Sequence, residues 1–111
     1  MQFALLYYYD PAVAGPTKEE LLDWLAFDAA VRKAGVFVHE AGFHSVARAR
    51  TVRVRDGETT SEKGGATGTP VLAGYYLVDV ADAEAAEMWA AMIPTARYGA
   101  VEVRPIVEYD G

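Results

Sequence analysis

Two segments that are apolar on both faces, residues 3–9 and 75–80, most constrain the fold of this chain. Successive side chains of a β-strand point to opposite sides, so an extended segment that is apolar at nearly every position needs cover on both faces. The first run, FALLYYY, is also too short for a membrane-spanning helix or a signal segment. We therefore predict that both segments are central strands of one sheet.

Two helices are predicted between the strands. Thr17 and Glu20 form a capping-box pattern ahead of an apolar-periodic run, and Gly35 is the expected end of that helix. Asp82 is the expected cap of a second helix that runs to about Met92. On a helical wheel one broad arc of the first helix is apolar and is expected to face the core: Leu21, Leu22, Trp24, Leu25, Phe27 and Val31.

The other extended segments are residues 36–43, 51–55, 58–61 and 101–108. Residues 51–55 and 101–108 alternate between apolar and polar side chains, which is typical of an edge strand. Asp56-Gly57 is a hairpin turn signal that joins residues 51–55 to residues 58–61. Pro105 cannot donate to a sheet, so the last segment is predicted at an edge. Residues 62–70, EKGGATGTP, form a glycine-rich loop.

The order of these elements predicts an α+β fold of the ferredoxin-like type, β-α-β-β-α-β with an extra hairpin, in which the four main strands of an antiparallel sheet lie in the order fourth, first, third, second. A chain of 111 residues is long enough for one domain, predicted over residues 1–111. Two helices cover only one face of the sheet. Burying some 600 Å² of apolar surface on the open face would contribute about 15 kcal/mol before association costs. We therefore predict a homodimer through the open sheet face.

Charge and cysteine content exclude several functions. The formal net charge of −6 argues against a nucleic-acid partner, because phosphate binding needs a basic surface. The absence of cysteine excludes disulfides, thiol catalysis and cysteine-bound metal sites. It is also compatible with a reducing cytoplasm, where we expect the protein to reside. No membrane association is expected.

The second half of the sequence resembles a known family. Residues 74–108, GYYLVDVADAEAAEMWAAMIPTARYGAVEVRPIVE, are similar to the C-terminal half of the YCII-related proteins, in particular the branch named for its DGPF motif. The segments LAFDAAVRKAGVFV and TVRVRDGETT resemble the first helix with the second strand, and the hairpin, of that family. This resemblance implies a dimeric α+β barrel. Where relatives carry a stretch like DGPFAETKE, this chain has EKGGATGTP, so a role of that loop in relatives does not transfer.

The resemblance also implies a type of chemistry. Some YCII-like proteins are proposed to use a histidine–aspartate pair, and a degradative dehydrochlorinase belongs to the wider superfamily. Such a pair would act as a general base at neutral pH, with the carboxylate orienting the imidazole. The two histidines of this chain, His39 and His44, follow the first helix, where relatives of the branch usually carry other residues.

Asp28 and His39 are the candidate catalytic residues. Asp28 falls near the middle of the apolar arc, four residues after Trp24, and a carboxylate there needs a partner or a shifted pKa. It is either an acid or base in a pocket between helix and sheet, or a structural carboxylate bonded to backbone, to a tyrosine or to Arg32. His39 is expected on the same strand face as Phe37. It is either the general base or a solvent-facing side chain.

Tyr7, Tyr9, Tyr76 and His44 are the candidate substrate-binding residues. Buried tyrosine hydroxyls need partners, which favours a small polar-lined cavity, although aromatic residues on central strands are mostly core. No HxH, HxxxH or HExxH spacing is present, and the glycine-rich loop lacks a phosphate-binding pattern, so neither a metal nor a cofactor is expected.

Two functions remain open. One is a cofactor-free acid–base enzyme, such as an isomerase or lyase, that acts on a small aromatic or carbonyl compound. The other is a non-catalytic dimeric module that binds a small ligand or a protein. The enzyme needs a histidine and a carboxylate that converge in a concave pocket. In the binding module both histidines face solvent.

Overall fold

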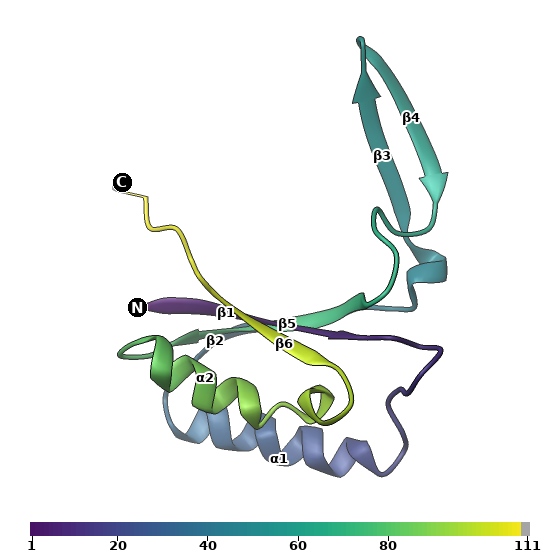
Figure 1. The fold of residues 1–111 in the computed structure, drawn as a ribbon. Coiled ribbons are helices and arrows are strands. Elements are labelled where there is room, and N and C mark those ends of the chain that lie inside the picture. Colours follow the sequence, from purple (N-terminus) through teal and green to yellow (C-terminus); the bar gives the residue numbers. More distant parts are fainter. Residues whose placement is uncertain (110–111) are drawn as a thin grey trace.

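The computed structural model describes residues 1–109 and has an α+β architecture (Figure 1). In chain order the elements are β1 (Gln2–Tyr9), α1 (Glu20–Lys33), β2 (Phe37–Gly42), the short 3-10 helix η1 (Val46–Arg48), β3 (Arg50–Arg55), β4 (Glu58–Lys63), β5 (Val71–Asp79), α2 (Ala83–Ala91), the 3-10 helix η2 (Pro94–Arg97) and β6 (Ala100–Pro105).

The main sheet is antiparallel and has the strand order β2-β5-β1-β6. The two apolar segments form its central strands, with Leu5 of β1 opposite Tyr76 of β5 and Val103 of β6. Strand β6, which ends at Pro105, lies at one edge. The predicted order is thereby confirmed.

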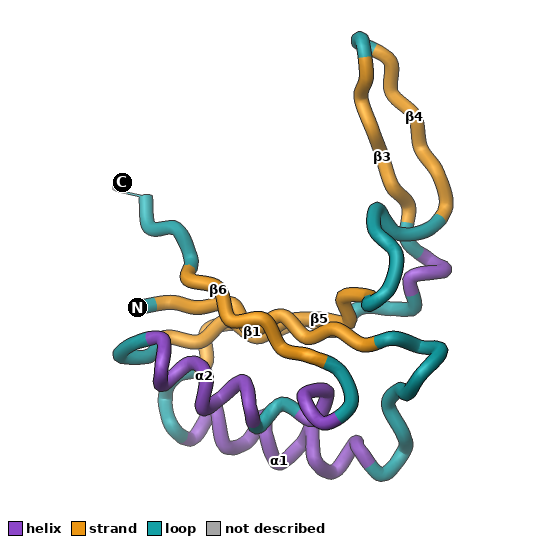
Figure 2. Tube along the Cα trace, in the orientation of Figure 1, coloured by secondary structure: helices purple, strands orange, loops and turns teal. Residues whose placement is uncertain are grey.

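Both helices lie on the same face of this sheet, and β3 and β4 form a separate hairpin (Figures 1 and 2). The core fills the space between the sheet and the helices. Its fully buried side chains include Phe3, Leu5, Val31, Val78 and Ile93. The fold is ferredoxin-like, as predicted, and is consistent with a dimeric α+β barrel.

Local turn and capping signals act as the sequence indicates. Gly35 ends α1 with a φ of 75°, in the left-handed region that favours glycine. The carboxylate of Asp82 accepts a hydrogen bond of 2.9 Å from the backbone N–H of Ala85, which caps α2. Asp56 and Gly57 have φ values of 52° and 78°, as a tight hairpin turn between β3 and β4 requires.

The start and orientation of α1 differ from the prediction. The helix begins at Glu20, and no side chain caps its N-terminus, so the capping box of Thr17 and Glu20 is wrong. The predicted apolar arc is wrong for Leu21, Leu22 and Leu25, which are exposed by 61%, 73% and 58%. The face toward the sheet instead carries residues spaced by four and three positions, which recur on one side of a helix. They are Glu20, Trp24, Phe27 and Val31.

The face of the sheet opposite the helices carries apolar side chains. Phe3 and Leu5 point toward the helices, so Ala4 and Leu6 point the other way, and their partners on β5 are Leu77 and Tyr75. No helix covers this side in Figure 1. This open sheet face is therefore an unpartnered apolar surface.

The β3–β4 hairpin projects from the main sheet on the side of the open sheet face (Figure 1). Val52 and Val54 on β3 are more than half exposed. The radius of gyration of 15.9 Å exceeds the roughly 13 Å of a compact chain of this length. The β3–β4 hairpin therefore extends beyond the protein's own core. An isolated two-stranded hairpin is at best marginally stable in water.

Candidate functional site

Asp28 is held by two partners at the rim of the core. The hydroxyl of Tyr76 donates to Oδ1 at 2.8 Å, and Nε of Arg32 donates to Oδ2 at 2.7 Å. The guanidinium of Arg32 also lies 3.9 Å from the centre of the Phe37 ring. Burial alone would raise the pKa of Asp28, but the hydrogen bonds from Arg32 and Tyr76 outweigh it and lower the pKa. Both oxygens of the carboxylate are therefore engaged. Their partners, a tyrosine and Arg32, are among those expected if Asp28 is a structural carboxylate rather than an acid or base.

His39 lies on the opposite face of the sheet. Phe37 pairs with Val78, but His39 pairs with Leu77, because β2 contains a bulge between them. The prediction that His39 shares a face with Phe37 is therefore wrong: Phe37 faces the helices and His39 faces the open side. Its ring lies 5.9 Å from that of Tyr75. His39 and Asp28 are thus separated by the sheet.

His44 lies in another part of the molecule. It lines a shallow hollow beside η1 with Phe43, Ser45, Arg48 and Ala49. Within residues 1–109, neither His39 nor His44 forms an ion pair or a side-chain hydrogen bond. Both side chains are exposed.

Tyr7 and Tyr9 line one cavity, whereas Tyr76 is engaged with Asp28. The cavity measures about 220 Å³ and lies between the end of β1, the start of α1 and η2. Its walls are Tyr7, Tyr9, Pro16, Glu20, Trp24, Gly42, Phe43, Ala73, Thr95 and Tyr98. We call it the Glu20 cavity.

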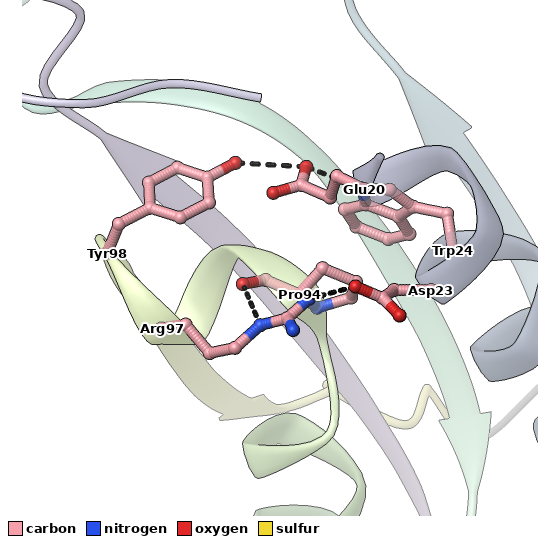
Figure 3. A network of polar contacts seen from close by, with 6 residues as sticks. All are labelled: Glu20, Asp23, Trp24, Pro94, Arg97 and Tyr98. Carbon is pink, nitrogen blue, oxygen red and sulfur yellow. Dashed lines mark hydrogen bonds and ion pairs between the residues drawn. The ribbon is translucent and has the colours of Figure 1, made fainter. Parts of the chain in front are cut away.

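Glu20 is the buried carboxylate of this cavity, with 8% of its surface exposed. Its Oε2 accepts a hydrogen bond of 2.9 Å from Nε1 of Trp24 and one of 3.1 Å from the hydroxyl of Tyr98 (Figure 3). Oε1 has no hydrogen-bond partner among residues 1–109. One carboxylate oxygen is therefore fixed by the protein, and the other has unused acceptor capacity.

A second polar contact fixes η2 beside α1. Arg97 donates to the carboxylate of Asp23 at 3.0 Å and to the carbonyl oxygen of Pro94 at 3.3 Å (Figure 3). This contact connects α1, which supplies Glu20, with η2, which directly precedes Tyr98. Arg97 is the basic side chain shown in Figure 3, and it does not line the Glu20 cavity.

Tyr7 brings a protonated hydroxyl to the cavity. The side chain is buried, and its hydroxyl has no side-chain partner within residues 1–109. A Cβ at Gly74 would collide with that hydroxyl, so glycine provides the room for it. Burial, with smaller contributions from Glu40 and Tyr98, raises the pKa of Tyr7 to about 12. At neutral pH this hydroxyl is therefore a hydrogen-bond donor.

Glu20, Trp24 and Tyr98 are the site residues that the sequence analysis missed. A signal for Glu20 existed, because it precedes Trp24 by four positions and therefore lies on the same helix face. The reasoning that singled out Asp28 applies equally to this second carboxylate. Tyr98 gave no such signal, because its contact with Glu20 spans 78 positions of the chain.

Residues 1–109 contain no group of three or more histidine, aspartate or glutamate side chains placed to hold a metal ion. No helix in the same part of the chain is long and apolar enough to cross a membrane.

The sheet order, the helices on one face and the cavity at the end of the central strand define a ferredoxin-like α+β protein with an aromatic-lined cavity. The YCII-related domain matches residues 1–110 of the sequence, so the chain belongs to the YCII-related domain family. No curated protein matches the sequence significantly.

Proposed function

We propose that this YCII-related protein binds a small organic molecule in the Glu20 cavity. The observation that carries the proposal is the pairing, in one cavity, of a buried carboxylate that has an unengaged oxygen with the Tyr7 hydroxyl. Among the described residues no fully buried side-chain oxygen or nitrogen lacks a partner, so these two unpartnered oxygens are accessible and open to a ligand. A ligand that both accepts from Tyr7 and donates to Glu20 would satisfy the two groups at once.

The same cavity supports cofactor-free acid–base chemistry as a second function. For a small carbonyl compound, Glu20 would remove a proton from the carbon beside the carbonyl group, and Tyr7 would donate a hydrogen bond to the carbonyl oxygen. Returning the proton to a different carbon completes an isomerisation. The observation that favours this chemistry is that an acceptor oxygen of Glu20 and the hydroxyl donor of Tyr7 line the same cavity.

Neither sequence-predicted catalytic residue supports this chemistry as well as Glu20. Asp28 is already engaged by Arg32 and Tyr76. His39 faces the open side of the sheet, away from the helices. Ligand binding is therefore the leading proposal, and turnover is tested separately.

We further propose that two copies, each a single domain over residues 1–111, pair through the open sheet face. Ala4, Leu6, Tyr75 and Leu77 supply its apolar centre. Glu102 of β6, which is opposite Leu6 and accepts a hydrogen bond of 3.2 Å from Tyr8, lies at its border. An apolar centre with a polar border is the pattern of a protein–protein interface.

The binding proposal is tested by a thermal-shift screen of small aromatic and carbonyl metabolites. A compound present at about ten times its Kd stabilises by about 1.4 kcal/mol, which raises the Tm of a domain of this size by about 5 °C. Each hit is repeated on Glu20→Gln and Tyr7→Phe, with His39→Ala and Asp28→Asn as comparisons. We expect the shift to vanish in the first two variants and to persist in the other two.

The opposite pattern would assign the ligand to the sequence-predicted residues, and a screen without hits would refute binding. Turnover of a hit is followed by hydrogen–deuterium exchange at its carbon atoms, measured by NMR in heavy water. Exchange that depends on Glu20 supports an enzyme. Binding without exchange supports the non-catalytic module.

A further inference from the structure

The charge in the Glu20 cavity is not balanced by its own walls. The lining contains the carboxylate of Glu20 and no lysine, arginine or histidine. Arg97, on the neighbouring η2, is engaged by Asp23 and by the Pro94 carbonyl oxygen. A buried carboxylate without a cationic partner is unfavourable unless hydrogen bonds or a bound positive charge compensate for it. Trp24 and Tyr98 compensate at one of its two oxygens, and the other oxygen is accessible from the cavity, where a positive charge can reach it.

The walls around this carboxylate are aromatic. The rings of Tyr7 and Trp24 are 5.0 Å apart, and those of Tyr9 and Tyr98 are 6.2 Å apart in an edge-on arrangement. Phe43, which is half exposed, completes the lining from the loop after β2. The negative faces of such rings attract cations, and sets of them recognise ammonium groups.

We propose that the ligand of the Glu20 cavity is a small organic cation with an ammonium group and an apolar body. This inference rests on the proposed binding function and names its ligand class. The ammonium group lies against the free oxygen of Glu20 and the surrounding rings, and the body fills the aromatic space. At about 220 Å³, the cavity is below the roughly 300–1,000 Å³ of typical drug-sized sites, so the ligand is small.

The donor set favours an organic cation over a metal ion. Calcium takes six to eight oxygen ligands and magnesium needs near-octahedral coordination. The Glu20 cavity offers one carboxylate, and the hydroxyls of Tyr7 and Tyr98 remain protonated because burial raises their pKa. An ammonium group needs only a hydrogen-bond acceptor and aromatic faces.

The test compares cations with neutral molecules of the same shape. The probes are 2-phenylethylammonium with 2-phenylethanol, and choline with 3,3-dimethylbutan-1-ol, titrated at pH 7 with tryptophan fluorescence and NMR as readouts. The variant is Glu20→Gln, whose amide oxygen still accepts from Trp24 and Tyr98 and therefore preserves the fold. The matched control is Glu19→Gln, which removes the same charge from an exposed neighbour.

We expect at least one cation to bind about tenfold or more tightly than its neutral analogue. Glu20→Gln should abolish this preference by lowering the affinity of the cation to that of its neutral analogue or below, and Glu19→Gln should change neither affinity. Equal binding of cation and analogue, or a preference that survives Glu20→Gln, would overturn the ligand class and leave the binding function intact. If none of the probes binds, the charge of the hits from the metabolite screen decides. Cationic hits support the proposed ligand class, whereas neutral or anionic hits refute the ligand class and leave the binding function intact. An absence of hits refutes both the ligand class and the binding function.

Discussion

Removing the hydroxyl of Tyr76 should destabilise the protein by about 1.5 kcal/mol at neutral pH. The hydroxyl donates to the carboxylate of Asp28 at 2.8 Å, and hydrogen bonds to charged groups contribute about 1.5–3 kcal/mol. The Asp28 side chain is 33% exposed and keeps Arg32 as a partner. Water can therefore replace the lost donor, which places Tyr76→Phe at the lower end of that range.

The effect should depend on pH with a defined sign. The pKa of Asp28 in the folded protein lies below its ordinary value of 3.8. A group whose pKa is lowered by folding contributes stability that is present above the ordinary value and is lost as the pH falls through the folded value. Tyr76→Phe removes one cause of the lowered pKa, so the stability gap between parent and variant should narrow as the pH falls below 3.8.

Urea unfolding at a fixed protein concentration, followed by circular dichroism from pH 7 to pH 3, measures this gap. Tyr109→Phe is the control, because the Tyr109 side chain is 87% exposed and belongs to no strand of the sheet. A gap below about 0.5 kcal/mol at pH 7, or one that does not change with pH, would refute the role assigned to the Tyr76–Asp28 hydrogen bond.

Three further substitutions test the core, the cavity and the dimer. Phe27→Ala removes a ring that lies 5.0 Å from Tyr76 and should lower the free energy of unfolding by about 3–5 kcal/mol, measured by urea denaturation; a loss below about 1.5 kcal/mol would contradict the packing. Gly74→Ala places a Cβ against the Tyr7 hydroxyl and 2.5 Å from the Ala41 carbonyl oxygen. It should cost about 1–3 kcal/mol and abolish ligand binding, whereas Gly68→Ala, which meets open space, should do neither. Leu77→Glu should convert a dimer to a folded monomer in sedimentation experiments, and an unchanged sedimentation coefficient would reject the open sheet face as the interface.

The fold was predictable because its strongest determinants are local and independent. Two strands apolar on both faces require central positions in a sheet, and the end of α1, the cap of α2 and the hairpin turn depend on Gly35, Asp82 and Asp56-Gly57 alone. Each of these signals needs only neighbouring residues. They agree on one topology.

The orientation of α1 was not predictable in the same way. The apolar arc of this helix is broad, and which part of it meets the sheet depends on packing against the whole sheet rather than on the helix itself. Trp24 and Phe27 pack against the sheet, and the exposed leucines of the helix are Leu21, Leu22 and Leu25. The capping-box pattern predicts an N-terminal, solvent-facing role for Glu20. Its position four residues before Trp24 instead places it on the buried face of α1.

The candidate site depends on contacts that no local pattern encodes. Tyr98 and Glu20 are 78 positions apart in the sequence. The bulge in β2 changes the face of His39, and no glycine or proline between Phe37 and His39 indicates a bulge in the sequence. Tyr7 and Tyr9 were predictable as cavity residues because alternation places both on one face of β1. The position of the carboxylate that accompanies them, Glu20, depends on how α1 packs against the sheet.

The bulge in β2 explains how two residues that are two positions apart face opposite sides of the sheet. Val38, the additional residue, allows Phe37 to remain among the interior rings and His39 to point outward within the span of two positions. Deleting Val38 would remove the bulge and make Phe37 and His39 direct neighbours, which point to opposite faces of a regular strand, so both side chains would keep their present faces. Among family members, a one-residue gap at this point would therefore indicate a regular edge strand that presents the same two faces without the bulge.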